Sequence, residues 1–211
     1  MTNTVGPDIY VRCEITSIKR DPKCDMQAPL DQKLIFFEKV RKIGKDLVNE
    51  EEYSNAKTLY SRCISIFKNM PKKQKDSLDE AQNKQRDEIL SILHLNCAHC
   101  LIKKKMYKDG IKAANEALQY IEENPKAYYR IAKAHQALRD YDKAQDNFKI
   151  AIRMDPNDKG LRDEYAKLLE LKNAKEKERF AKVSGFLHTN QMKDLEKSCA
   201  DEQLLRDKIK R

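Results

Sequence analysis

The chain has 211 residues, of which 36% are charged, and its formal net charge is +9 at pH 7. It contains only five glycines and no tryptophan, which favours a helical protein with large solvated faces over the compact core of a typical enzyme. No apolar run reaches the ~20 residues needed to span a bilayer, and the N-terminus lacks an apolar signal-peptide segment, so we expect a soluble, cytoplasmic protein.

The basic residues are interleaved with acidic ones, and their densest runs are residues 71–75 and 103–105. No recognisable nucleic-acid-binding module accompanies this charge, so we expect no nucleic-acid partner and assign most of the lysines to solvated surface. Lysines that face a groove would suit an acidic peptide. The scarcity of glycine also leaves little room for a phosphate-binding loop.

The six cysteines are irregularly spaced, which favours reduced thiols over a disulfide framework. Cys97 and Cys100 have the spacing of a metal or redox pair, but Cys97 falls on a predicted core position, and the pair therefore suits helix packing better. The histidines show no ligand spacing. We predict neither a metal nor a cofactor, and no catalytic residues.

Residues 1–30 form an N-terminal extension, and one segment of it shows alternating apolar and polar residues. Between Asp8 and Ile18, the residues Ile9, Val11, Cys13 and Ile15 fall on one face, as in a half-buried β-strand. A lone strand cannot satisfy its own backbone groups, so we expect either disorder or addition to a sheet edge of another protein.

Three further segments, residues 37–70, 91–124 and 125–158, share one pattern of two amphipathic helices. The small residue that lets the two helices touch is Ala56, Gly110 and Ala144 in turn, which gives steps of 54 and 34 residues. A 34-residue period is typical of tetratricopeptide repeats (TPRs), and the longer first step predicts an insertion at residues 71–90. The pattern predicts an all-α, right-handed solenoid of three TPRs over residues 31–187.

A capping helix is predicted at about residues 159–187, followed by a polar tail at residues 188–211. The basic segment 172–187 carries Phe180, Val183 and Phe186, which suit either packing against the third repeat or an external helix-binding partner.

The concave side of such an array is lined by the first helix of each repeat. On these helices the polar candidates are Arg41 and Lys45 in repeat one, Asn96 in repeat two, and Lys126 and Arg130 in repeat three. Both pairs of cations are spaced by one helical turn, so each pair projects from one face. The same residues, taken singly, also suit a solvated helix surface.

The segment from Asp31 to Leu187 resembles the TPR region of FKBP-type immunophilins and their AIP-type and cyclophilin-type relatives. The resemblance rests on the insertion after repeat one, the string from Leu93 to Cys100, and the charged-then-aromatic segment from Ala174 to Phe180. The strand at Asp8 to Ile18 resembles the last strand of an FKBP domain. Since the rest of that domain is not in this sequence, we expect no prolyl isomerase activity.

The resemblance implies a carboxylate clamp for the C-terminal Glu-Glu-Val-Asp tail of heat-shock protein 90 or 70, formed by Arg41, Asn96, Lys126 and Arg130. Arg and Lys donate charge-assisted hydrogen bonds to carboxylates, and an Asn amide bonds carboxylate and backbone together. Lys45 departs from the family, which usually has a second Asn there, because Lys supplies charge but no acceptor.

Two functions follow from these observations. One is a non-catalytic, immunophilin-like co-chaperone adaptor that binds the acidic chaperone tail. The alternative is a structural subunit of a larger assembly, with the TPR groove or the N-terminal strand bound to a fixed partner.

Overall fold

The computed structural model describes residues 26–209, and every regular element within that range is a helix. The β-strand predicted between Asp8 and Ile18 lies outside the described residues. The chain divides into two units, residues 1–163 and 164–211. The first unit holds all the predicted repeats and the site described below.

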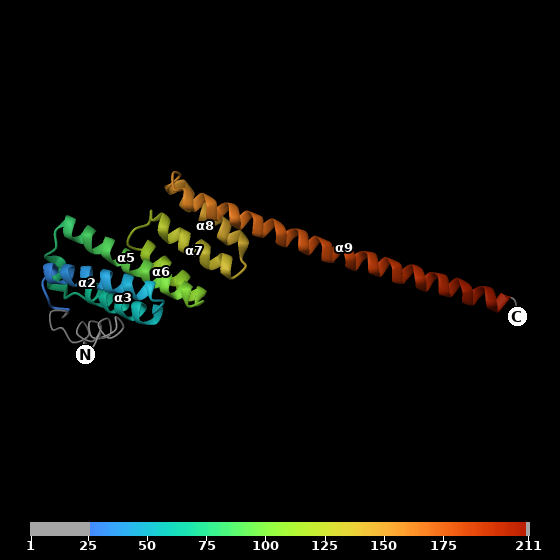
Figure 1. The fold of residues 1–211 in the computed structure, drawn as a ribbon, viewed down its shortest axis with the longest axis horizontal. Coiled ribbons are helices and arrows are strands. Elements are labelled where there is room, and N and C mark those ends of the chain that lie inside the picture. The colour runs from blue at the N-terminus through green and yellow to red at the C-terminus, as the bar shows by residue number, and fades with distance from the viewer. Residues whose placement is uncertain (1–25, 210–211) are drawn as a thin grey trace, which may run out of the picture. The chain divides into compact units, whose positions relative to one another are not determined.

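Three pairs of helices follow one another along the first unit (Figure 1). Within each pair the two helices pack together, and α3 packs on α5, α6 on α7, and α5 on α7. The pairs are α2 (Leu30–Asn49) with α3 (Tyr53–Lys68), α5 (Glu80–Lys103) with α6 (Tyr107–Leu118), and α7 (Pro125–Ala137) with α8 (Tyr141–Met154). The predicted all-helical, TPR-like array of helix pairs is therefore confirmed.

The turn inside each pair is the same turn repeated three times. One non-glycine residue has a positive φ in each, namely Glu51 (62°), Lys105 (62°) and Arg139 (63°), again at steps of 54 and 34 residues. The following N–H bonds a carbonyl five residues back, which satisfies the free carbonyls at the end of the helix. These bonds are Glu52 N to Leu47 O at 2.8 Å, Met106 N to Leu101 O at 2.9 Å and Asp140 N to His135 O at 3.0 Å.

Small and large residues compensate one another where the helices of a pair cross. In repeat one a Cβ added to Gly44 would lie 2.5 Å from Cε1 of Tyr60 and closer still to its Cζ and Oη, so the bare glycine makes room for the ring. Repeats two and three place alanine at the equivalent of Gly44. The three pairs of equivalent positions are Gly44 with Tyr60, Ala98 with Ala114, and Ala132 with Phe148.

The insertion after repeat one is largely helical. It contains the short helix α4 (Lys72–Asp76) and the first turns of α5, which begins at Glu80 and not near residue 91. The early start has a local cause, which is a capping box. The side chain of Asp79 accepts from the backbone N–H of Gln82 at 2.7 Å, and the side chain of Gln82 accepts from the backbone N–H of Asp79 at 3.1 Å.

A buried lysine attaches α4 to the first repeat. Lys33 on α2 is only 1% exposed, and its Nζ donates to Met26 O and to Gln74 Oε1, both at 2.7 Å. Gln74 in turn donates to Ala28 O at 2.8 Å. Because a buried ammonium requires acceptors, these contacts hold residues 26–28, α2 and α4 together.

The last helix, α9 (Lys159–Ile209), continues well beyond residue 187, where the sequence pattern placed the end of the capping helix. No glycine–proline stop signal follows residue 187, and helix formers dominate the tail. On this helix Phe180, Val183 and Phe186 are exposed. None of the helices within residues 26–209 has an apolar stretch long enough to cross a bilayer.

Candidate functional site

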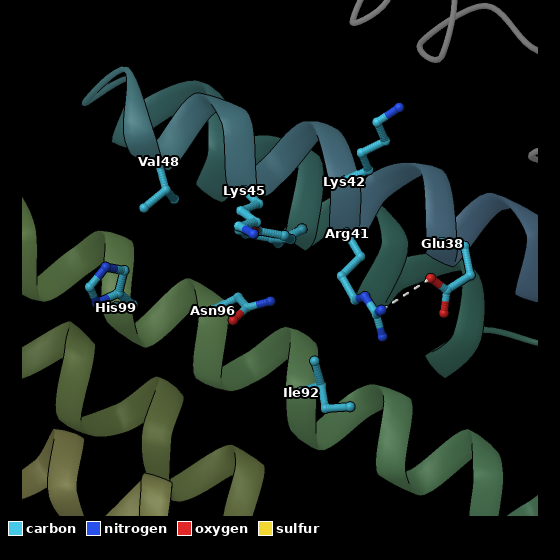
Figure 2. A pocket seen from close by; sticks show the side chains of 9 residues that line it. Glu38, Arg41, Lys42, Lys45, Val48, Ile92, Asn96 and His99 are labelled. Atoms are coloured by element: carbon cyan, nitrogen blue, oxygen red, sulfur yellow. Dashed lines mark ion pairs between the residues drawn. The ribbon is translucent and has the colours of Figure 1, made fainter. Parts of the chain in front are cut away.

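A pocket of about 500 Å³ lies between α2 and α5 (Figure 2). Three of the five predicted binding residues, Arg41, Lys45 and Asn96, line it together. The remaining lining residues are Glu38, Lys42, Val48, Tyr60, Ile92 and His99. Figure 2 shows Arg41 and Lys45 reaching from α2 toward α5, from which Asn96 and His99 point back.

Helical spacing explains why these residues share a space. On α2 the core side chains include Val40, Ile43 and Leu47, which turns the face of Arg41 and Lys45 away from the core. On α5 the groove face carries Ile92, Asn96 and His99 at steps of four and three, beside a core face that includes Leu93, Cys97 and Cys100. The pocket therefore forms where two amphipathic helices present their polar stripes to each other.

The pocket is cationic, with Arg41, Lys42 and Lys45 set against one carboxylate, that of Glu38. Arg41 Nη2 lies 3.5 Å from Glu38 Oε2, but these side chains are 57% and 60% exposed. An ion pair in that setting contributes little to stability. The Arg41 guanidinium can therefore exchange Glu38 for an anionic ligand at small cost.

The two predicted residues of α7 are placed differently. Lys126 lies in the first turn of α7, where its backbone N–H donates to Asn124 Oδ1 at 3.1 Å. Its side chain is exposed and does not line this pocket. Arg130 is partly buried and reaches the pocket through a neighbour, because its Nη1 lies 2.8 Å from Nδ1 of His99. Among the described residues the Nε of Arg130 is buried without a hydrogen-bond partner.

His99 and Tyr60 were not predicted as site residues. His99 follows Asn96 by three residues, and that spacing could have placed it on the same face. Burial, followed by the nearby charges of Arg130 and Lys103, lowers the pKa of His99 to about 4. Burial raises the pKa of Tyr60, so at neutral pH both side chains are uncharged.

A second pocket of about 610 Å³ adjoins the first, and the two share Glu38 and Ile92. It lies over the N-terminal halves of α2 and α5, and its lining is more apolar. The residues that belong to it alone are Leu34, Ile35, Phe37, Lys39, Gln85, Glu88 and Ile89.

The cysteines of α5 belong to the buried core of the first unit. Cys97 and Cys100 are buried as free thiols, and burial raises the pKa of Cys97 to about 12 and that of Cys100 to about 11. No cluster of three potential metal ligands occurs in the part of the chain that the structure describes. Both thiols are therefore protonated packing groups of the core, in line with the helix-packing interpretation.

Helix pairs in tandem with a polar groove on their first helices define a TPR-type binding module. In agreement with this, residues 125–158 match the family model for the tetratricopeptide repeat. The sequence is 34% identical to peptidyl-prolyl cis-trans isomerase FKBP42 of Arabidopsis thaliana over 62% of this chain and 35% of that protein. The chain thus spans about a third of the length of this curated relative.

Solved structures share the fold. The C-terminal TPR-containing domain of a Plasmodium falciparum FK506-binding protein has a TM-score of 0.57 at 22% identity, covering 70% of this chain and 95% of that one. The second TPR domain of human RPAP3, solved in complex with the HSP70 peptide SGPTIEEVD, has a TM-score of 0.50 at 20% identity, covering 64% and 97%. The resemblance to the TPR region of FKBP-type proteins is confirmed.

Proposed function

We propose that this chain is a non-catalytic adaptor that binds the acidic C-terminal tail of heat-shock protein 90 or 70. The observation that carries the proposal is the cationic pocket, where Arg41, Lys45 and Asn96 from two repeats face one space. The peptide seen on the RPAP3 domain ends in Glu-Glu-Val-Asp, whose terminal carboxylate and Asp side chain place two anions together.

The chemistry of the pocket suits such a ligand. The guanidinium of Arg41 and the ammonium of Lys45 donate charge-assisted hydrogen bonds to a carboxylate, and the amide of Asn96 can donate to a carboxylate or accept from a peptide N–H. Lys126 on α7 is exposed, so its ammonium can donate to a second carboxylate. Lys45 replaces an acceptor by a charge, which shifts the preference of the site toward more acidic ligands.

The cysteines also bear on where this adaptor works, since Cys63, Cys97 and Cys100 are buried and form no disulfide within the described part of the chain. Thiols remain reduced in the cytosol and are oxidised in secretory compartments. We therefore place the proposed function in the cytoplasm, the compartment expected from the sequence.

The test is a titration of the pentapeptide Met-Glu-Glu-Val-Asp into the protein, with the heat of binding measured by calorimetry. Because hydrogen bonds to charged groups contribute about 1.5–3 kcal/mol, Asn96→Ala, Lys126→Ala and Arg130→Ala should each weaken binding by about tenfold or more. Arg41→Ala should lie at the lower end of that range, since Arg41 is more than half exposed. Binding should weaken with added salt, because the contacts are ionic.

Two controls sharpen this test. Lys112→Ala removes an exposed cation from α6, outside the pocket, and should leave the affinity unchanged. The same peptide with an amidated C-terminus lacks the main-chain carboxylate and should bind far more weakly. If the wild-type chain does not bind the free peptide, the adaptor proposal is wrong and the scaffold alternative takes its place.

A further inference from the structure

His99 connects the third repeat to the pocket of the first two. Its ring projects from α5 and lines the pocket (Figure 2). Its Nδ1 lies 2.8 Å from Nη1 of Arg130 on α7. An arginine side chain has donors and no acceptor, so the nitrogen that faces it must accept. In the neutral ring the proton is then on Nε2, which is the other side of the imidazole.

We propose that His99 is a carboxylate-binding residue of this pocket. Its Nε2–H donates to a carboxylate oxygen of the bound acidic peptide, while its Nδ1 holds Arg130 in place. This inference rests on the proposed function and adds a sixth residue to the predicted set. It also gives Arg130 an indirect route to the ligand, because the two groups are joined through one imidazole.

The electrostatic surroundings of His99 make this contact dependent on pH. In the free protein, burial and neighbouring cations keep the ring neutral. A bound carboxylate favours the charged form of the ring, so the pKa of His99 rises in the complex. The Arg130 guanidinium limits this rise, because a second ring proton would lie on Nδ1 and displace the hydrogen bond from Arg130. The charged groups that act on the ring in the free protein are Arg130 on α7 and Lys103 on α5. Arg41 and Lys45 on α2 and the neutral Tyr60 on α3 line the same pocket.

The sign of the effect follows from linkage. A group whose pKa is higher in the complex binds more protons there, so the affinity that it contributes grows as pH falls toward the pKa of the complex. The acidic side chains of the peptide begin to protonate near pH 4, which sets the lower limit of the useful range. The affinity of the wild-type chain should therefore rise between neutral and mildly acidic pH.

The first measurement is a titration of the His99 imidazole by NMR, with and without saturating Met-Glu-Glu-Val-Asp. The expected result is the Nε2–H tautomer in the free protein and a higher pKa of His99 in the complex. A pKa that is the same in both states would overturn the inference. His135, which lies on α7 outside the pocket, is the internal control, and its titration should not respond to the peptide.

Three substitutions separate the two roles of the ring. His99→Asn keeps an acceptor near the position of Nδ1 but does not reach the pocket, His99→Gln keeps a donor near the position of Nε2, and His99→Met keeps neither. We expect His99→Asn and His99→Met to lose about tenfold in affinity and the pH dependence with it, and His99→Gln to retain more of the affinity.

The matched control is His135→Asn, which should bind as the wild type does. If His99→Asn also binds as the wild type does, His99 only supports Arg130 and the inference is refuted, although the proposed function stands. If the wild-type chain itself fails to bind the peptide, both are refuted.

Discussion

The contact between Gly44 and Tyr60 predicts that a single added methyl group destabilises the first repeat. A Cβ at Gly44 would lie 2.5 Å from Cε1 of Tyr60 and nearer to Cζ and Oη. Tyr60 is only 3% exposed and its ring is rigid, so it cannot move aside without displacing its neighbours. The Gly44→Ala variant should therefore be overpacked.

The magnitude is a balance of two opposing effects. Overpacking a core costs about 1–3 kcal/mol. Replacing glycine by alanine within a helix stabilises it by about 0.8–1 kcal/mol. The free energy of unfolding should fall by up to about 2 kcal/mol, which corresponds to a melting temperature lower by up to about 8 °C for a chain of this size.

A double-mutant cycle measured by urea unfolding and circular dichroism checks this reasoning. Tyr60→Leu removes Cε1, Cζ and Oη, so in that background Gly44→Ala should instead stabilise the protein by up to about 1 kcal/mol. The sign of the effect thus reverses, with a coupling energy equal to the overpacking cost of about 1–3 kcal/mol. If Gly44→Ala has the same effect in both backgrounds, the proposed clash does not determine the stability of this repeat.

Three other perturbations test the remaining features of the fold. Lys33→Met removes the buried donor that joins α4 to α2, so it should lower the free energy of unfolding by about 1–3 kcal/mol and speed amide exchange in α4. Lys72→Met, on the exposed face of α4, is the control and should change neither quantity. Arg139→Gly relieves a positive φ and should raise the melting temperature by about 2–4 °C, while Leu138→Gly next to it should lower it; a drop for Arg139→Gly would contradict the turn geometry. Because burial raises the pKa of Cys97 to about 12, thiol reagents at neutral pH should modify it only when the protein opens. Mass spectrometry should therefore find that urea accelerates the labelling of Cys97, and rapid labelling in native conditions would contradict its burial.

The repeat array could be predicted from the sequence because its signals are local. A helix buries residues at steps of three and four, and the steps of 54 and 34 residues between Ala56, Gly110 and Ala144 mark equivalent positions without any knowledge of the packing. The same register placed Arg41, Lys45 and Asn96 on the first helices, and they line one pocket. The capping box of Asp79 and Gln82 is also a local signal, and it marks the start of α5 at Glu80 and not near residue 91.

Other features depend on how helices distant in the sequence meet. The hydrogen bond between His99 and Arg130 forms only because α5 and α7 pack at one particular register, which no periodicity reports. The glycine at residue 44 is explained by Tyr60 on the next helix, and the buried Lys33 by Gln74 on α4. The sequence by itself determined the helix pairs and the face on which the polar residues lie, since both follow from backbone periodicity. Only the tertiary structure decided which of those polar groups touch, because contact distances of a few ångströms are set by the packing of whole helices.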